Sequence, residues 1–468
     1  MLKKTKIIAT ISDLNCDVDF LKKLYTKGVN IMRLNTAHQS PKDTLKVVKN
    51  IRKVSDKIAI LIDTKGPEVR ITDLDKTIEL KKGDKIFLKG SKSDKSSRDC
   101  VYVNYPKFVS DVPKNSRIFI DDGKLSLKVI SKTSTKLVCL VENNGSIKKK
   151  KSVNVPSVHL NLPTLTKKDK EFIKFSVEND IDFIAHSFVR TKQDVIAVRK
   201  LARKYGKDIK VISKIENQEG VDNLSEILEE TYGVMVARGD LAIEIPAEKV
   251  PIIQKKIINE CITMRHPVIV ATQMLQSMIE NPRPTRAEIS DVANAIYSGT
   301  DAIMLSEETA MGKHPIEAVE VMVKVALEVE KEMPGFNDLP VKMINNEISA
   351  YLAKSAVIAT QRLPIVAILT DAMTGRTARY ISAFRANVPI FVECYEKNTM
   401  RELALSYGVQ PSYVHKSKKI GDYIGFTVRD LLKKRLLKQE DLISIIAGSY
   451  DSRSQPTFME ISEAKKLI

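Results

Sequence analysis

Eight short apolar runs, rich in β-branched residues and mostly separated by helical patterns, constrain the fold of this chain more than any other feature. Runs that are apolar throughout suit parallel strands buried on both faces, and parallel strands need long crossovers between them. Eight alternations of strand and helix are typical of an α/β fold of the (β/α)8 TIM barrel type, which we therefore predict. The predicted strands are residues 6–10, 30–35, 58–64, 181–188, 210–216, 233–239, 267–272 and 301–306.

The interval between residues 64 and 181 breaks the alternation. It holds short alternating runs and turn signals such as Lys82-Gly83-Asp84, which are typical of a small all-β domain. Inserted after the third strand, this domain lies at the C-terminal face of the barrel, so we predict a lid. Beyond a linker at 334–340, further helices and strands predict a C-terminal α/β domain for regulation or assembly. The predicted boundaries are 1–69 plus 158–340 for the barrel, 70–157 for the lid and 341–468 for the C-terminal domain.

The composition excludes several classes of protein. With 43% hydrophobic and 29% charged residues, the chain is neither a disordered tail nor a coiled-coil rod. Its apolar runs are far shorter than the roughly 20 residues of a membrane span, and its start shows no signal-peptide pattern. Five scattered cysteines favour a reduced cytoplasm. The net charge of +18 is dispersed and comes without tryptophan, which favours steering of anionic substrates over nucleic acid binding.

Polar and charged residues gather at the C-terminal ends of six predicted strands, where barrel enzymes place their functional side chains. Lys214 and Glu216 are two apart on one strand, so both point to the same side. Glu216 and Asp240 offer two carboxylates for a hard cation such as Mg²⁺. Arg33, Lys214 and Arg70 supply positive charge for a phosphate. Taken alone, these residues predict a barrel enzyme that uses Mg²⁺ and a phosphorylated anionic substrate.

Five sequence motifs identify a family resemblance. They are residues 63–70 (DTKGPEVR), 212–217 (ISKIEN), 236–241 (VARGDL), 271–275 (ATQML) and 282–288 (PRPTRAE). In this order they resemble the pyruvate kinase family, and the resemblance covers the chain from end to end. The family has a barrel, a β-domain lid after the third strand and a C-terminal α/β domain that often binds effectors. Its members transfer phosphate from phosphoenolpyruvate to ADP, giving ATP and an enolate that is protonated to pyruvate, usually as cytoplasmic homotetramers.

The resemblance also implies roles for individual residues. Lys214 would neutralise the transferring phosphoryl group and the developing enolate oxygen, and Thr272 would lie near the methylene carbon at the head of a proton relay. Ser306 and Glu308 match residues further along that relay, and Arg33 matches the phosphate-binding arginine. The implied substrate contacts are Arg33, Lys214, Gly239, Asp240 and Thr272; the Mg²⁺ or Mn²⁺ ligands Glu216 and Asp240; the K⁺ ligands Asn35, Asp63 and Thr64; and the nucleotide contacts Asn35, His38, Arg70 and Lys151.

The chain departs from the family pattern near the predicted cation and nucleotide sites. Ala37 stands where the family usually has a serine that binds K⁺, while Glu68 matches potassium-dependent members. We therefore predict that K⁺ activation survives in a weaker form. Residues 12–15 replace the family's loop after the first strand, which lies near the nucleotide. His186 stands where a small residue is usual, and we expect it to be packed rather than catalytic.

The C-terminal domain departs further. Residues 370–377 resemble the family's phosphate-binding loop with one extra residue, and a hydroxyl-rich loop before a helix suits a sugar phosphate. Residues 448–455 lack the motif that usually completes this site, so fructose 1,6-bisphosphate is a candidate effector without its full binding site. The candidate effector residues are Thr370, Thr374, Gly375, Arg376 and Thr377.

Three other hypotheses stay open. A barrel enzyme of another reaction type, such as a decarboxylase, would use the same metal and Lys214, but the predicted lid and the presence of Thr272 argue against it. A binding protein with a lapsed active site would not need its complete set of candidate residues. An RNA-binding role rests only on the net charge of +18 and would need a steep salt dependence of affinity.

Overall fold

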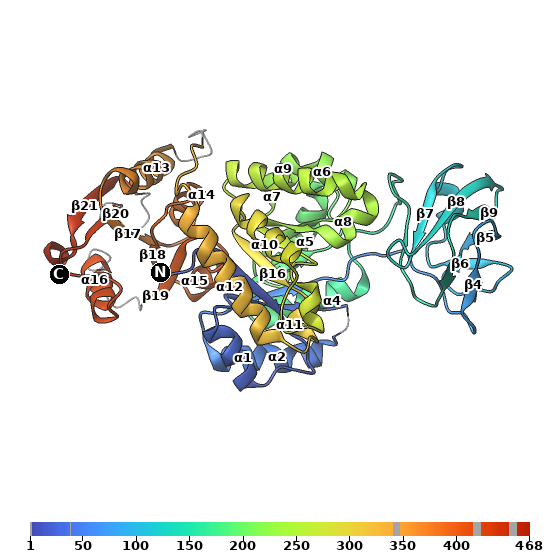
Figure 1. Ribbon diagram of the computed structural model, residues 1–468, viewed down its shortest axis with the longest axis horizontal. Helices are drawn as coiled ribbons and strands as arrows, with labels where there is room; N and C mark the ends of the chain where they lie inside the picture. The colour runs from blue at the N-terminus through green and yellow to red at the C-terminus, as the bar shows by residue number, and fades with distance from the viewer. Residues whose placement is uncertain (1, 38, 340–346, 415–422, 449–455) are drawn as a thin grey trace.

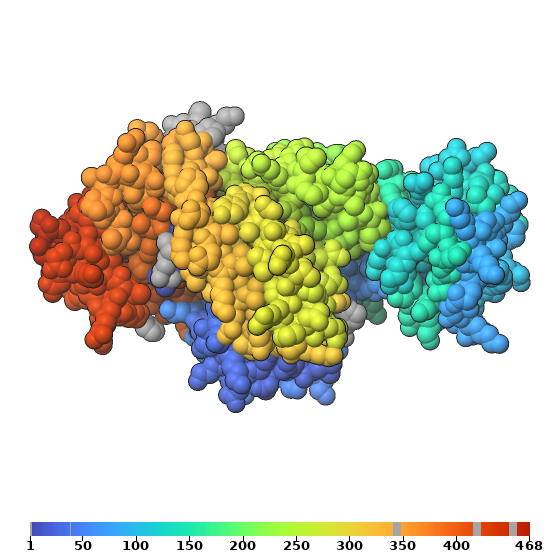
Figure 2. All heavy atoms as spheres, viewed as in Figure 1, coloured from blue at the N-terminus to red at the C-terminus, as the bar shows by residue number. Residues whose placement is uncertain are grey.

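The computed structural model describes residues 2–37, 39–339, 347–414, 423–448 and 456–468. Three bodies lie in a row, with the barrel between a C-terminal α/β body and an all-β body (Figure 1). The all-β body joins the barrel through a narrow waist, whereas the C-terminal body meets it over a broad surface (Figure 2). No described helix is long and apolar enough to cross a membrane.

The central body is a closed barrel of eight parallel strands, as predicted. The strands follow one another around the barrel in chain order, and β1 pairs with β16 to close it, with Lys6 opposite Ala302. Each strand coincides with a predicted run, although most are shorter because the polar residues at the run ends leave the hydrogen-bonded ladder. The strands are β1 (Lys6–Thr10), β2 (Ile31–Asn35), β3 (Ala59–Asp63), β12 (Phe183–His186), β13 (Lys210–Ile215), β14 (Gly233–Ala237), β15 (Val268–Ala271) and β16 (Ala302–Leu305).

Helices surround the barrel, and several begin at caps that the sequence encodes. Thr285 accepts a hydrogen bond from the N–H of Glu288, whose carboxylate accepts one from the N–H of Thr285, and Thr166 and Asp169 repeat this capping box. The helices are α1 (Val18–Thr26), α2 (Pro41–Val54), α4 (Lys167–Glu178), α5 (Lys192–Lys204), α6 (Gln218–Asp222), α7 (Leu224–Glu230), α8 (Arg238–Glu244), α9 (Val250–Thr263), α10 (Arg286–Tyr297), α11 (Glu307–Ala310) and α12 (Pro315–Glu332), with 3-10 turns η1 (Ala247–Lys249) and η2 (Gln276–Ile279).

The all-β body has its own apolar core, which runs from Val69 to Val155. Its sheets have the strand orders β10-β4 and β11-β7-β8-β9-β5-β6. Four of its strands are only two or three residues long, so none of them shows a clear alternating pattern by itself. The exact domain boundaries stay predictions. The elements are β4 (Ile78–Leu80), β5 (Lys85–Gly90), β6 (Val101–Val103), α3 (Phe108–Asp111), β7 (Arg117–Ile120), β8 (Leu125–Lys132), β9 (Leu137–Val141), β10 (Gly145–Ile147) and β11 (Val153–Asn154).

The C-terminal body is a five-stranded sheet in the order β19-β18-β17-β20-β21, with β21 antiparallel to β20. Two of these strands were not predicted: β19 contains Pro411, and β21 has no fully buried residue, so neither forms a clear apolar run. The elements are α13 (Glu347–Arg362), β17 (Ile365–Ala372), α14 (Arg376–Ala383), β18 (Ile390–Cys394), α15 (Lys397–Leu403), β19 (Val409–Tyr413), α16 (Tyr423–Lys433), β20 (Leu442–Ala447), β21 (Phe458–Glu463) and the 3-10 turn η4 (Ala464–Leu467).

The C-terminal body closes the N-terminal mouth of the barrel. Ala404 and Leu405, just after α15, belong to the apolar cluster that fills the barrel interior. Beside them, the Arg385 guanidinium contacts both carboxylate oxygens of Asp301 at 3.0 and 2.9 Å, and both side chains are buried. The opposite mouth, where the strands end, stays free for substrates and for the all-β lid.

We expect Lys6 to make folding stability depend on pH. Its side chain is buried where the barrel meets the C-terminal body, and its Nζ donates a hydrogen bond to the carbonyl oxygen of Val409. Burial lowers the pKa of Lys6 to about 8 from 10.5, although Glu330 and Asp301 oppose this effect. Between these pH values the unfolded chain holds more protons than the folded protein, so stability rises with pH.

In the wild type, the titration of Lys6 should raise the free energy of unfolding by about 3 kcal/mol between pH 8 and pH 10.5. The variant Lys6→Met should lack this increase. The measurement is urea denaturation at several pH values. Lys331→Met, which removes an exposed lysine on α12, is the control, and its free energy of unfolding should change with pH as in the wild type. Equal slopes for wild type and Lys6→Met would contradict the assignment.

Candidate active site

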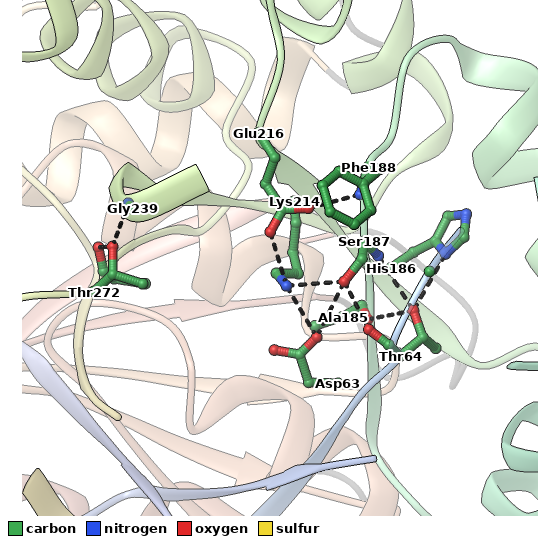
Figure 3. Close-up of polar contacts among 12 residues, drawn as sticks. Asp63, Thr64, Ala185, His186, Ser187, Phe188, Lys214, Glu216, Gly239 and Thr272 are labelled. Carbon is green, nitrogen blue, oxygen red and sulfur yellow. Dashed lines mark hydrogen bonds and ion pairs between the residues drawn. The ribbon is translucent and has the colours of Figure 1, made fainter. Parts of the chain in front are cut away.

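The candidate residues from several strands converge at the C-terminal mouth of the barrel. Asp63 ends β3, Lys214 lies on β13, and Thr272 directly follows β15. Figure 3 shows Lys214 between Asp63 and Glu216, with Thr272 and Gly239 forming a second contact group to one side. The parallel register of the barrel explains this convergence, because all eight strands end at the same mouth.

The Lys214 ammonium group lies at the centre of the site. Its Nζ is 3.2 Å from Asp63 Oδ1 and 2.9 Å from Glu216 Oε1. It also donates to Ser187 Oγ at 2.9 Å. Burial alone would lower the pKa of Lys214, but the carboxylates around it raise the pKa above its ordinary value. The ammonium is therefore charged, and its three N–H groups all face partners within the protein.

Asp63 connects this lysine to Arg33. Arg33 Nε donates to Asp63 Oδ2 at 2.7 Å, and its Nη1 donates to Thr10 Oγ1 at 2.9 Å. Burial would raise the pKa of Asp63, but Lys214 and Arg33 hold it below its usual value. One buried carboxylate thus fixes two cations side by side at the mouth of the barrel.

Glu216 and Asp240 form a pair of acidic groups suited to a divalent cation. Glu216 is 1% exposed, and its Oε2 accepts a hydrogen bond from the N–H of Phe188 at 2.7 Å. Its Oε1 faces the Lys214 ammonium but accepts no hydrogen bond of acceptable geometry. Burial raises the pKa of Glu216 to about 7 against the opposing effect of Lys214, and burial also raises the pKa of Asp240.

These properties fit Mg²⁺ or Mn²⁺. Glu216 and Asp240 place a buried and a partly buried carboxylate close together, and the single ammonium of Lys214, which also contacts Asp63, balances their charge only in part. Among the described residues, no three His, Cys, Asp or Glu side chains form a metal-binding group. A hard cation held by two carboxylates would complete its shell with substrate and water oxygens.

Thr272 has an unusual backbone conformation. Its φ is 68°, and Gln273 follows with a φ of 54°, a region that β-branched residues rarely adopt. The Thr272 hydroxyl accepts a hydrogen bond from the N–H of Gly239 at 2.8 Å and donates to the Ala271 carbonyl at 2.6 Å. The strained turn holds this hydroxyl at the barrel mouth (Figure 3).

Glu308 links the loops that follow β15 and β16. It is 2% exposed and accepts hydrogen bonds from the N–H groups of Leu275 at 3.1 Å and Ser306 at 2.7 Å. Both carboxylate oxygens are therefore engaged in holding backbone. The structure brings Ser306 and Glu308 together, and their part in a proton relay stays a prediction.

The predicted K⁺ ligands lie on neighbouring strands, with Asn35 on β2 directly opposite Asp63 on β3. Asn35 Oδ1 accepts a hydrogen bond from the N–H of Ala37 at 3.0 Å. Thr64 Oγ1 lies 3.4 Å from His186 Nδ1 and accepts a hydrogen bond from the N–H of Ser187. These groups offer oxygen ligands suited to a hard monovalent cation, but Ala37 adds no side-chain oxygen.

Burial lowers the pKa of His186 to about 4, so this side chain is packed and neutral at pH 7.

The predicted nucleotide contacts lie at the base of the lid. Arg70 contacts Glu68 Oε2 at 2.8 Å and the Lys150 carbonyl, and Lys151 pairs with Asp121 at 2.8 Å. His38 lies outside the described residues. A cavity of about 580 Å³ separates lid from barrel, and lid residues such as Asp122 face barrel residues such as Asp240 across it. The nucleotide roles of these residues stay predictions.

Sequence reasoning missed three side chains that organise the site. Ser187 accepts from Lys214 and donates to the Thr64 carbonyl at 2.7 Å, and Thr10 supports Arg33. Lys168 Nζ lies 3.3 Å from the Ala37 carbonyl, next to the predicted cation site. Ser187 and Thr10 follow or end strands, which is the only signal that could have singled them out.

The candidate effector loop follows β17 in the C-terminal body. Gly375 has a φ of 73° and begins α14, and a side chain there would collide with Leu403 of α15. Thr374 and Arg376 are exposed, whereas Thr370 is buried. Thr377 is partly exposed on the first turn of α14. The effector role of this loop stays a prediction, and most of residues 448–455 lie outside the described ranges.

Two family models and several relatives of known function match this chain, and all of them belong to one family. Residues 2–319 match the family model described as pyruvate kinase, barrel domain, and residues 351–459 match pyruvate kinase, alpha/beta domain. The chain is 47% identical to pyruvate kinase of Borreliella burgdorferi, over 100% of this chain and 98% of the relative. It is 41% identical to pyruvate kinase of Geobacillus stearothermophilus (96% and 78%) and 39% identical to that of Clostridium acetobutylicum (96% of each).

The acidic pair generates a prediction about metal binding. Glu216→Gln removes one anionic ligand, and we expect affinity for Mn²⁺ to fall at least about tenfold. Mn²⁺ titration followed by electron paramagnetic resonance measures this without turnover. The matched control is Glu244→Gln, one turn beyond Asp240 on α8. Equal losses in both variants, or none in Glu216→Gln, would show that the cation binds elsewhere.

Proposed function

Because the chain belongs to the pyruvate kinase family, it is a phosphotransferase that passes the phosphoryl group of phosphoenolpyruvate to ADP, and we propose which residues carry this transfer. The reaction gives pyruvate and ATP and is a step of glycolysis. The observation that carries the assignment is the buried Lys214 ammonium, held between Asp63 and Glu216 with a third carboxylate, Asp240, nearby. It supports a site built to stabilise negative charge on a phosphoryl group and on an enolate oxygen.

Arg33 and Lys214 bind and orient the substrate phosphate in this proposal. Both are fixed by Asp63, so little reorganisation is needed when the anion arrives. Glu216 and Asp240 would hold Mg²⁺ or Mn²⁺, which supplies Lewis-acid polarisation of the phosphoryl and enolate oxygens. When Glu216 is engaged in this way, Lys214 frees one N–H group for the substrate while Asp63 and Ser187 keep its position.

Thr272 acts at the second half of the reaction. After phosphoryl transfer the enolate carries charge on its oxygen, and its methylene carbon takes up one proton to become the methyl group of pyruvate. The Thr272 hydroxyl, held by the Gly239 N–H, is oriented to pass that proton from solvent or from Ser306 and Glu308. Gly239 and Asp240, at the start of α8, complete the proposed substrate contacts.

The lid completes the site over the barrel mouth. Between residues 70 and 157 the chain has 20 Lys and Arg against 10 Asp and Glu, so this segment carries +10 of the total +18. Phosphoenolpyruvate and ADP are both multiply charged anions, and a basic lid supports their capture. Closure around Asn35, His38, Arg70 and Lys151 would exclude water and hold the nucleotide.

We further propose that the protein is a cytoplasmic homotetramer activated by K⁺, with the loop at 370–377 as its effector site. The family resemblance supports the assembly and the location. Oxygen ligands on Asn35, Asp63 and Thr64 support the cation site. The glycine at the start of α14 supports anion binding by the effector loop, for which a sugar phosphate is the candidate.

The variant Lys214→Met tests the central assignment. It removes the ammonium that stabilises developing charge, and we expect kcat for pyruvate formation to fall by about 10²–10³-fold. Lys210→Met lies on the same strand at the opposite end of the barrel and should retain activity. A kcat of Lys214→Met equal to that of the wild type would contradict the role of this lysine in the proposed mechanism.

K⁺ dependence is tested by restoring the missing hydroxyl. We expect wild-type kcat/KM to be higher in K⁺ than in Na⁺, and Ala37→Ser to increase that ratio about fivefold, the equivalent of ~1 kcal/mol. Activity should be measured at equal ionic strength with saturating Mg²⁺. Activity that is the same in both salts for wild type and variant would exclude the proposed cation site.

A further inference from the structure

The strained turn after β15 needs a compensating interaction. Two consecutive residues other than glycine, Thr272 and Gln273, have positive φ angles of 68° and 54°. Such conformations cost about 1–3 kcal/mol each and persist only where neighbouring groups fix them. The buried Glu308 carboxylate holds the far side of this turn through Leu275. The near side, which includes the Thr272 peptide, is held by another group.

That group is Arg238, at the start of α8. Its Nη2 donates to the Thr272 carbonyl at 2.7 Å, and its Nε donates to the Ala271 carbonyl at 3.3 Å. Its Nη1 pairs with Asp291 Oδ1 on α10 at 2.7 Å. The side chain is 12% exposed. A single guanidinium therefore ties the strained peptide to a helix on the outside of the barrel.

The next two residues of α8, Gly239 and Asp240, belong to the proposed active site. The Gly239 N–H holds the Thr272 hydroxyl at 2.8 Å, and Asp240 is a proposed metal ligand. Arg238 thus hydrogen-bonds the backbone carbonyl of Thr272, while the N–H of Gly239 hydrogen-bonds its hydroxyl. Three consecutive residues on one short helix therefore set the position of this hydroxyl relative to the Asp240 carboxylate.

We propose that Arg238 is a positioning residue for the protonation step, which it serves by holding the Thr272 hydroxyl at the methylene carbon of the enolate. The inference rests on the proposed role of Thr272. Lysine cannot replace arginine here, because one ammonium on a flexible stem cannot contact two carbonyls and a carboxylate in a fixed fork. The Arg238 guanidinium contacts the Ala271 and Thr272 carbonyls and Asp291, none of which is a proposed phosphate or metal ligand through these atoms, so its loss should affect proton transfer more than binding.

The test separates proton transfer from phosphoryl transfer and from metal binding. The proposed protonation step, run in reverse in D₂O with Mg²⁺, K⁺ and ATP, would exchange the methyl protons of pyruvate for deuterium through the enolate, and NMR would measure the rate. We expect Arg238→Lys to slow this exchange by about 10–100-fold, because a shift of about 1 Å in a reacting group has effects of this size. Mn²⁺ affinity and KM for phosphoenolpyruvate should stay within about threefold.

Two controls make the outcome decisive. Arg199→Lys removes an arginine that pairs with Glu230 on the outside of the barrel and should leave exchange unchanged. Asp291→Asn weakens the outer anchor of Arg238 and should slow exchange less than Arg238→Lys. Exchange within threefold of wild type in Arg238→Lys, or equal losses of exchange, Mn²⁺ affinity and thermal stability, would overturn the proposal. A wild-type enzyme that forms no pyruvate would instead overturn the assigned function.

Discussion

The carboxylate of Asp63 is the group on which the rest of the site depends. It is 1% exposed and faces two cations from different strands, Arg33 on β2 and Lys214 on β13. Two positive charges this close would repel each other without it, and Lys214 would lose part of the field that keeps it protonated inside the barrel. The parallel register of β2 and β3 places Asp63 at the mouth, so the electrostatics follow directly from the strand alignment.

The two other bodies occupy opposite ends of the barrel, and their attachments differ accordingly. The C-terminal body seals the N-terminal mouth with Ala404 and Leu405 and with the buried Arg385–Asp301 pair. Apolar packing with buried ion pairs suits a permanent connection. The lid is joined by a narrow waist at the other mouth (Figure 2) and has its own core. This arrangement allows the lid to close over substrate without disturbing the barrel.

Periodicity predicted the barrel, and strand-end chemistry predicted which polar residues gather at its mouth, because both depend on local sequence. The two-residue spacing of Lys214 and Glu216 on one strand is enough to predict that both side chains point to the same side. Ser187 and Arg238 also follow strand ends, but this position alone assigns neither of them a role. Their importance comes from partners distant in sequence, Lys214 for Ser187 and the Thr272 carbonyl for Arg238. The positive φ of Thr272 was equally hidden, because a threonine favours extended backbone and tertiary contacts override that preference.

A crystal structure of the protein with Mg²⁺ and phosphoenolpyruvate, without ADP, would test the account most directly. The account predicts that Glu216 Oε1 leaves Lys214 for the metal, and that Lys214 Nζ keeps Asp63 and Ser187 while donating to a phosphate oxygen. Thr272 should keep its positive φ with its hydroxyl facing the methylene carbon. A complex in which Lys214 still contacts Glu216 and no substrate oxygen lies within hydrogen-bond distance would contradict it.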